Sequence, residues 1–126
     1  ALPIYVKNQG LTNHIIMDED LTIHRHVMPH LDLITSGVAV ESPSEVVDSH
    51  RLYTVFEYIR DEYDVIIVDT PSVLSVTDAL VISEKADGVL LVVKGDYVQP
   101  DDMALAKQRL EQIGVAIIGS VFIDME

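Results

Sequence analysis

One aspartate, Asp69, directly follows four β-branched apolar residues at positions 65–68, and Thr70 and Pro71 come after it. Such a run between polar ends is typical of a strand that is buried on both faces of a parallel sheet. In these sheets the functional groups collect just beyond the carboxyl ends of the strands. A carboxylate at that point can orient Mg²⁺, directly or through water, beside the phosphates of a nucleotide. The pattern therefore predicts a metal-orienting role for Asp69, although an aspartate that merely ends a strand has the same pattern.

Histidines and acids between residues 18 and 30 form a second candidate site. Imidazole and carboxylate groups together suit zinc or a similar ion. The residues concerned are Asp18, Glu19, Asp20, His24, His26 and His30. A loop leaves their geometry unconstrained, so a solvated connection is the interpretation that we favour.

Hydroxyl groups offer weaker candidates. Ser36 and Ser72 lie outside any Gly-x-Ser-x-Gly pattern and are typical of turns. Tyr53, Tyr58 and Tyr63 lie on or near one expected helix and are candidate phosphate acceptors. Aromatic packing against a sheet explains Tyr53 and Tyr58 at least as well.

The elements that must position these groups alternate between strands and helices. Besides residues 65–68, apolar runs at 31–35, 88–93 and 115–123 predict strands. Helices are predicted from Pro43 to Asp61, from a start at Ser75 with Asp78 three residues on, and from Pro100 to Gly114. Residues 10–17 suggest a short helix, and residues 18–30 a loop or irregular strand. This alternation predicts an α/β fold, with a mostly parallel sheet flanked by helices.

Apolar positions predict the buried face of two of these helices. Leu52, Val55, Phe56 and Ile59 share one face of the helix that begins at Pro43. Met103, Ala106, Leu110 and Ile113 line the helix that begins at Pro100.

Composition excludes several classes of protein. The 126 residues suit one domain, or most of one, and carry a formal net charge of −13. Such a charge opposes binding to nucleic acid or to an anionic membrane surface. No apolar run approaches the length of a membrane span, no signal peptide is visible and cysteine is absent. We expect a soluble, cytoplasmic chain without direct membrane insertion, and a piece of something longer.

Several stretches resemble one family when they are taken together: the bacterial tyrosine kinases of capsule and exopolysaccharide synthesis. The central stretch resembles that family's Walker B region, and the resemblance extends from about Gly10 to the end of the chain. The stretches are residues 10–13 (GLTN), 31–37 (LDLITSG), 42–47 (SPSEVV), 63–74 (YDVIIVDTPSVL), 76–79 (VTDA) and 86–93 (ADGVLLVV).

The resemblance implies a P-loop NTPase-like fold that is incomplete at its N-terminus, so that residues 1–126 are a single partial domain, its C-terminal portion. It also implies Mg-ATP binding between subunits, autophosphorylation in a terminal tyrosine cluster and a membrane-anchored polysaccharide co-polymerase partner. Asp69 would bind Mg²⁺ and act in catalysis, with Thr70 and Pro71 beside the nucleotide. The family usually has an Asn near the adenine where this chain has Ile123, so the neighbouring Asp124 is assigned to the nucleotide site.

The sequence departs from the family's pattern in ways that bear on activity. The glycines with phosphate-loop spacing, Gly114 and Gly119, lie in or beside an apolar run and are followed by Ser120 and Val121 rather than by Lys and Ser or Thr. The second aspartate motif and the tyrosine cluster are missing as well. Pro71 is followed by Ser72 where a second proline is common.

Because loop amides, lysine and metal supply most of the phosphate neutralisation, we expect this chain alone to be inactive and to bind no cofactor. The expected parent is an ATP-dependent tyrosine autokinase, a homo-oligomer located in the cytoplasm and peripheral to the membrane through its partner. The alternatives are a non-catalytic pseudo-ATPase interaction module, or a relative of septum, partition or pilus-assembly ATPases.

Overall fold

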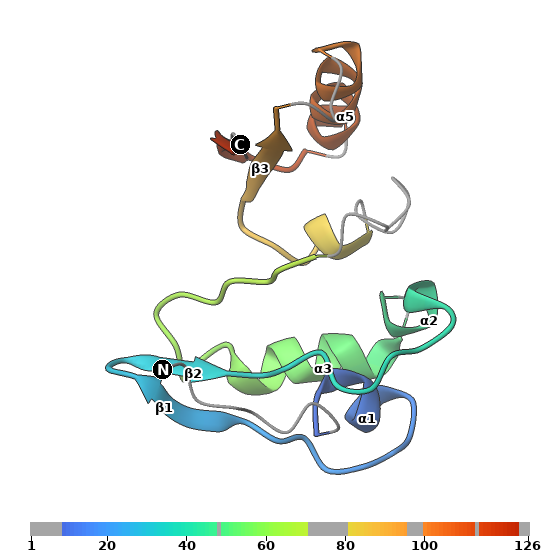
Figure 1. Cartoon of the computed structure of the whole chain (residues 1–126), viewed down its shortest axis with the longest axis vertical. Coiled ribbons are helices and arrows are strands. Elements are labelled where there is room, and N and C mark those ends of the chain that lie inside the picture. Colours follow the sequence, from blue (N-terminus) through green and yellow to red (C-terminus); the bar gives the residue numbers. More distant parts are fainter. Residues whose placement is uncertain (1–8, 48, 71–80, 96–99, 113, 124–126) are drawn as a thin grey trace. The chain divides into compact units, whose positions relative to one another are not determined.

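The computed structural model describes residues 9–47, 49–70, 81–95, 100–112 and 114–123 (Figure 1). Its contacts divide the chain into two compact units, Ala1–Ile66 and Ile67–Glu126. Within the described residues the elements form a mixed α/β arrangement, with one antiparallel and one parallel pair of strands. The expected α/β class is confirmed at this level.

The described residues of the first unit form three short helices and a hairpin. These are α1 Leu11–Ile15, β1 His24–Met28, β2 Leu31–Leu33, α2 Pro43–Val47 and α3 His50–Ile59. The predicted strand at residues 31–35 is present as β2, but it pairs antiparallel with β1 rather than parallel within a larger sheet. The reason is the tight turn before it, where His30 takes a φ of 61° and the chain reverses.

Helix α1 is fixed to the loop that follows β2. The Asn13 Oδ1 accepts hydrogen bonds from the backbone N–H groups of Gly10 (3.1 Å) and Val38 (3.2 Å). The Thr12 hydroxyl donates to the Val38 carbonyl at 2.6 Å. Gly37 has a φ of +85°, and a Cβ at Gly10 would collide with the Gly37 backbone nitrogen. Both glycines are therefore required by the close approach of the two segments.

The predicted helix from Pro43 to Asp61 is wrong in its continuity, because the chain forms α2 and α3 with a break between them. Ser49 has extended backbone angles (φ −70°, ψ 133°), and its hydroxyl accepts a hydrogen bond from the Arg51 N–H at 3.1 Å. A serine in this position satisfies an N–H group that the helix itself leaves unbonded, so it starts a new helix.

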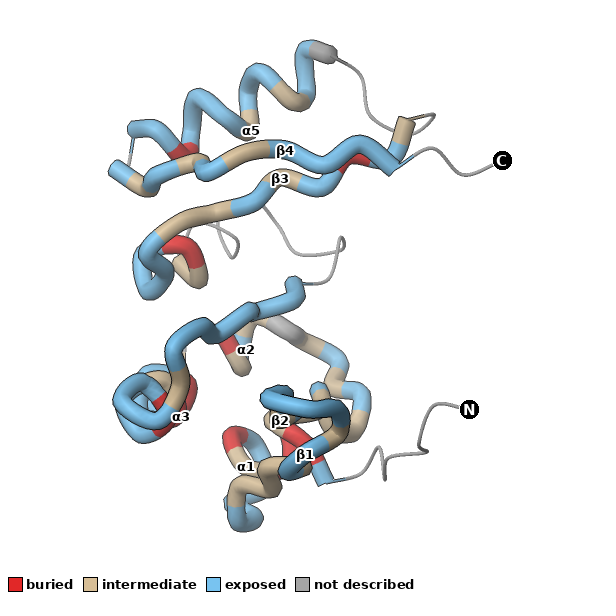
Figure 2. Tube along the Cα trace, turned by 90° about the vertical axis from the view of Figure 1, so that its left-hand side faces the viewer, coloured by how far each residue is buried: buried red, intermediate tan, exposed pale blue. Residues whose placement is uncertain are grey.

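The buried face predicted for this region is present on α3. Leu52, Val55 and Ile59 retain only 5%, 4% and 6% of their surface, and Phe56 is half-buried. Figure 2 shows the buried positions of α3 in red along one side of the helix. Tyr53 and Tyr58 of the same helix are exposed.

The second unit contains β3 Val89–Lys94, α5 Pro100–Gln112 and β4 Ile117–Ile123. Strands β3 and β4 are parallel, and α5 packs on β4, as the predicted strand–helix–strand pattern requires (Figure 2). Leu110 of α5 and Val93 of β3 are buried. Gly114 follows α5 with a φ of +81°, the left-handed conformation that commonly ends a helix.

Two further predictions concern residues that lie partly or wholly outside the described ranges. The helix expected from Ser75 and Asp78 begins outside the described residues, although residues 81–83 are helical. Ile113, expected on the buried side of α5, also lies outside them. Among the helices that are described, none has the length and apolar character needed to cross a membrane.

The predicted strand at residues 65–68 is not formed. Residues 65–70 are extended but pair with none of the described strands. Val65 is 74% exposed and Ile67 is 87% exposed. A strand exists only where a neighbour satisfies its N–H and C=O groups, so an apolar sequence alone does not produce one.

The α3 core gives a test of the first unit. We expect Leu52→Ala to lower the free energy of unfolding by about 2–4 kcal/mol, because it leaves a cavity beneath a buried face. The change should be measured by urea denaturation followed by circular dichroism. Tyr53→Ala, on the exposed side of the same helix, is the matched control and should cost less than about 0.5 kcal/mol. Equal losses in both variants would show that α3 is not packed by this face.

Candidate functional site

The structure describes half of the residues predicted to form the nucleotide site. Asp69 and Thr70 lie on the exposed 65–70 run, whereas Pro71 and Asp124 fall outside the described residues. An exposed carboxylate suits Mg²⁺, which prefers hard oxygen ligands. One such group is enough to orient a hydrated metal ion but not to hold a triphosphate. The assignment of all four residues to a nucleotide site stays a prediction.

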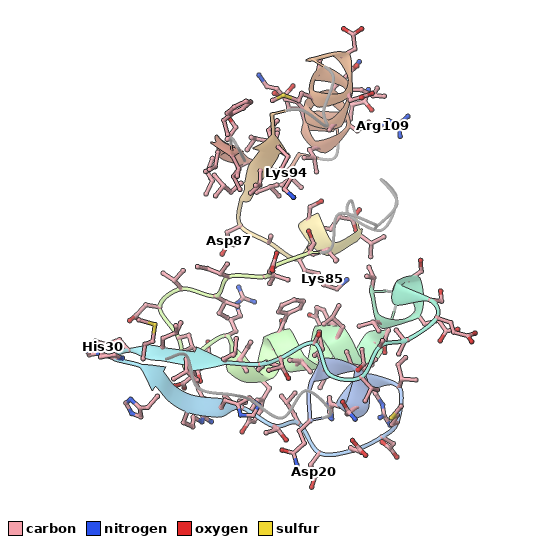
Figure 3. The ribbon with its side chains drawn as sticks, viewed as in Figure 1. Asp20, His30, Lys85, Asp87, Lys94 and Arg109 are labelled. Atoms are coloured by element: carbon pink, nitrogen blue, oxygen red, sulfur yellow. The ribbon has the colours of Figure 1, made fainter. Side chains whose placement is uncertain are left out.

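The histidines and acids considered for zinc do not come together. Within the described ranges, no group of three or more His, Asp or Glu side chains could hold a metal ion. Figure 3 shows the reason: His30 lies at the tip of the β1–β2 hairpin, away from Asp20 on the loop that precedes β1. His24 and His26 belong to β1 itself, so the stretch is partly an irregular hairpin.

A different set of polar side chains joins the β1–β2 hairpin to the segment after α3. We call Arg25, Asp32 and Tyr63 the hairpin cluster. The Tyr63 hydroxyl donates to Asp32 Oδ2 at 2.5 Å, and the Arg25 Nη1 donates to the same oxygen at 3.2 Å. The Arg25 Nη1 also lies 2.8 Å from the Tyr63 hydroxyl oxygen, which can accept from it. The other Asp32 oxygen accepts from the backbone N–H of His26 at 2.9 Å.

Hydrogen bonding shifts the acid–base behaviour of this cluster. The Tyr63 hydroxyl, the His26 N–H and the Arg25 guanidinium together lower the pKa of Asp32 to about 2. The same carboxylate raises the pKa of Tyr63, because a phenolate there would face a negative charge. It also raises the pKa of Arg25. The cluster therefore favours one state, with the carboxylate ionised and the phenol protonated.

Sequence reasoning missed the hairpin cluster. The sequence places Asp32 in a predicted strand and Tyr63 among the candidate phosphate acceptors, and it gives Arg25 no role. The one available signal is that Asp32 interrupts an otherwise apolar stretch, since an acid in such a position usually has a partner. Nothing in that signal identifies the partner, because Tyr63 lies 31 residues further along the chain.

A depression of about 380 Å³ lies between α1, residues 21–25 and α3. Leu21, Ile23 and Val55 supply its apolar lining, and Arg25 and Thr54 are among its polar lining residues. Both polar groups are already bonded within the protein, since Arg25 contacts Asp32 and the Thr54 hydroxyl donates to the His50 carbonyl at 3.2 Å. The depression contains no pair of groups arranged for acid–base or nucleophilic catalysis.

Comparison with known proteins places this arrangement in a class. No protein-family model matches the sequence. The tyrosine-protein kinase etk of Escherichia coli strain K12 is 39% identical over 114 residues, which are 89% of this chain and 16% of that protein. The tyrosine-protein kinase CpsD of Streptococcus agalactiae serotype III is 30% identical over 115 residues, covering 90% of this chain and 50% of that protein.

A solved structure agrees with these sequence matches. The kinase domain of the Escherichia coli tyrosine kinase ETK superposes with a TM-score of 0.80 and 32% identity, covering 95% of this chain and 48% of that domain. The described mixed α/β arrangement thus matches part of a tyrosine kinase domain of the P-loop class. The chain is a homologue of the bacterial tyrosine kinases over about nine-tenths of its length, which confirms the resemblance found in the sequence. It spans half or less of the length of each of these three proteins.

The hairpin cluster predicts how stability depends on pH. The folded-state pKa of Asp32 is depressed from 3.8 to about 2, so its contribution is present above the unfolded value and is lost as pH falls through the folded value. We expect Asp32→Asn to be less stable than the wild type at pH 7. This difference should shrink between pH 4 and pH 2, when measured by urea denaturation at each pH. A difference that stayed constant over this range would contradict the assignment.

Proposed function

We propose that residues 1–126 are the C-terminal portion of an ATP-dependent protein-tyrosine kinase domain, from the group that regulates exopolysaccharide synthesis. The observation that carries the proposal is the combination of identity and fold. The relatives are tyrosine kinases by name, they match 89% and 90% of the chain, and the ETK kinase domain superposes over 95% of it. The Asp69 run lies inside this matched region and has the residue types that a metal–nucleotide site needs.

In this proposal the complete domain has a mostly parallel sheet flanked by helices, of the P-loop NTPase type. The 65–70 run becomes one of its strands and ends with Asp69 at the carboxyl edge. Asp69 orients Mg²⁺ through one of its oxygens or through a bound water molecule. Thr70 and Pro71 shape the turn beside the phosphates, and Asp124 lies near the base. The bound Mg-ATP supplies the phosphoryl group for tyrosine autophosphorylation.

The 126 residues by themselves are proposed to be inactive. A phosphate cradle needs a glycine-rich loop with a lysine, and this sequence contains no Gly-x-x-x-x-Gly-Lys pattern followed by Ser or Thr. Electrostatic stabilisation of the transferred phosphoryl group is the largest single term in this chemistry. One carboxylate that orients a metal ion does not replace that loop.

The setting proposed for the complete protein follows from the same kinship. It is a cytoplasmic homo-oligomer at the inner face of the membrane, held there by a membrane-anchored polysaccharide co-polymerase. The net charge of −13 on the 126 residues supports the exclusion of nucleic acid and of direct contact with anionic lipid.

Calorimetry with Mg-ATP tests the proposal. We expect no measurable binding by the 126 residues alone and micromolar affinity in a protein extended by the residues encoded upstream. In the extended protein, Asp69→Asn should lower autokinase activity about a hundredfold, because a group that stabilises transition-state charge is removed. Asp87→Asn is the matched control, since Asp87 is an exposed acid of the same unit and has no proposed role.

Three outcomes would each contradict part of the proposal. Micromolar ATP affinity in the 126 residues alone would contradict the predicted inactivity. An extended protein without a Gly-Lys-Ser or Gly-Lys-Thr loop that binds no ATP would instead be a non-catalytic pseudo-ATPase module. A loop accompanied by ATPase activity but no tyrosine phosphorylation would favour the septum, partition or pilus-assembly relatives.

A further inference from the structure

The Tyr63 hydroxyl holds together two segments of the first unit. It donates to Asp32 on β2, and its oxygen lies within hydrogen-bonding distance of Arg25 on β1. Arg25 also lies 3.7 Å from Glu62, the residue just before Tyr63. Both strands of the hairpin are thus tied to the segment after α3 through one phenol and its neighbour. A chemical change at that oxygen would act on all of these contacts at once.

Tyr63 differs from the other described tyrosines in its backbone. Tyr53 and Tyr58 lie within α3, where the helix hydrogen bonds prevent the chain from extending. Tyr63 follows the turn after α3, and residues 63–70 form neither helix nor strand. The remaining tyrosines, Tyr5 and Tyr97, lie outside the described residues. A segment without regular hydrogen bonding can adopt the extended form in which an enzyme reaches a side chain at low cost.

Charge around Tyr63 is strongly negative. Asp61, Glu62 and Asp64 flank it in the sequence, and Asp32 contacts it in space. Enzymes that modify side chains discriminate partly by such charge patterns. The local charge also determines what a new phosphate would meet, since Arg25 is the single cation bonded to this hydroxyl among the described residues.

We propose that Tyr63 is a phosphorylation site, and that its modification breaks the link between Asp32 of β2 and the segment after α3. The proposal deepens the proposed function, because it names a residue of this chain as a target of the tyrosine kinase class to which the chain is related. It does not require the 126 residues to bind ATP themselves. A kinase acting in trans, such as another complete copy, performs the reaction.

The chemistry is a single phosphoryl transfer from Mg-ATP. The Tyr63 phenol oxygen forms a bond to the γ-phosphorus, the bond from that phosphorus to the β–γ bridging oxygen breaks, and ADP leaves. The phenol proton passes to the kinase's base or to water. In the closed cluster this proton is bonded to Asp32, and the raised pKa of Tyr63 makes its oxygen a weak nucleophile. Opening of the cluster therefore precedes transfer.

Phosphorylation then prevents the cluster from closing again. The hydroxyl proton that bonded Asp32 is gone, and a group carrying a charge of about −1.5 to −2 stands in its place. Asp32 and Glu62 repel that group, whereas Arg25 attracts it. Arg25 pairs with the phosphate and leaves Asp32. Strand β2 loses its link through Asp32, whereas Arg25 of β1 stays bound to the phosphate, so the modification acts as a switch between two pairings of the hairpin.

The test supplies an active bacterial tyrosine kinase domain and Mg-ATP in trans, and locates phosphate on the 126-residue chain by mass spectrometry. We expect modification at Tyr63 and not at Tyr53 or Tyr58. Asp32→Asn should raise the initial rate at Tyr63 about tenfold, the factor that corresponds to losing one charge-assisted hydrogen bond. Glu57→Gln, which removes the exposed Arg60–Glu57 ion pair, is the matched control and should leave the rate unchanged.

Hydrogen exchange on the phosphorylated chain provides the second readout. The His26 amide, which donates to Asp32 in the closed cluster, should exchange about tenfold faster after modification. Amides of α3 should keep their rates, which separates loss of the Asp32 link from general unfolding. The proposal would be overturned if Tyr63 stayed unmodified in both the wild type and Asp32→Asn. Labelling of the added kinase by itself shows that the kinase is active in that experiment. Unchanged exchange at His26 would overturn the switch.

These results are separable from the proposed function. Because the kinase is added in trans, modification at Tyr63 is observed whether or not an extended protein binds ATP. An extended protein that binds ATP while Tyr63 is never modified would refute this inference alone.

Discussion

A β-strand must have its N–H and C=O groups satisfied by a neighbouring strand. This requirement decides whether the 65–70 run, which contains Asp69, forms a strand. The 65–70 run has the composition of a buried strand, yet it is unpaired among the described residues and its apolar side chains are exposed. Strands β3 and β4 also leave apolar side chains exposed. The hydrogen bonds between the two strands are made, but Val92 and Phe122 remain 61% and 66% exposed. Parallel sheets normally have both faces covered, so this exposure of apolar side chains is unusual for a parallel pair.

The first unit satisfies its polar groups in a different way, through side chains. Asn13 accepts from one backbone N–H at the start of α1 and from another in the loop after β2, and Asp32 accepts from a backbone N–H, a guanidinium and a phenol. These bonds are local in space and need no additional strand. The first unit can therefore reach a defined arrangement while the 65–70 run does not. The contrast explains why the best-defined electrostatic site in the described chain is the hairpin cluster and not the predicted nucleotide site.

Local patterns were sufficient to predict elements whose determinants lie close together in the sequence. The apolar face of α3, the start of α5 at Pro100 with two acids after it, and the parallel pairing of β3 with β4 were all visible in this way. Two features were not. A helix was predicted to continue through Ser49, because its apolar spacing continues while a single hydroxyl starts a new helix. The direction of β2 depended on a non-glycine residue, His30, taking a positive φ.

The hairpin cluster could not be predicted from the sequence. Tyr63 bonds to Asp32, which lies 31 positions earlier in the chain, and to Arg25, which lies 38 positions earlier. Sequence patterns report periodicity within one element, whereas such bonds depend on how elements meet. The same limit applies to the site predicted at Asp69. The residue types of this predicted site can be read from a short stretch of sequence at a strand end. The geometry of the site depends on neighbouring strands, which a short stretch does not reveal. A metal-orienting carboxylate acts only when a sheet fixes it relative to the phosphates, since a displacement of about 1 Å costs a large factor in rate. Residue type and strand pairing are thus separate requirements, and the described residues meet only the first at Asp69, where the metal-orienting role stays a prediction.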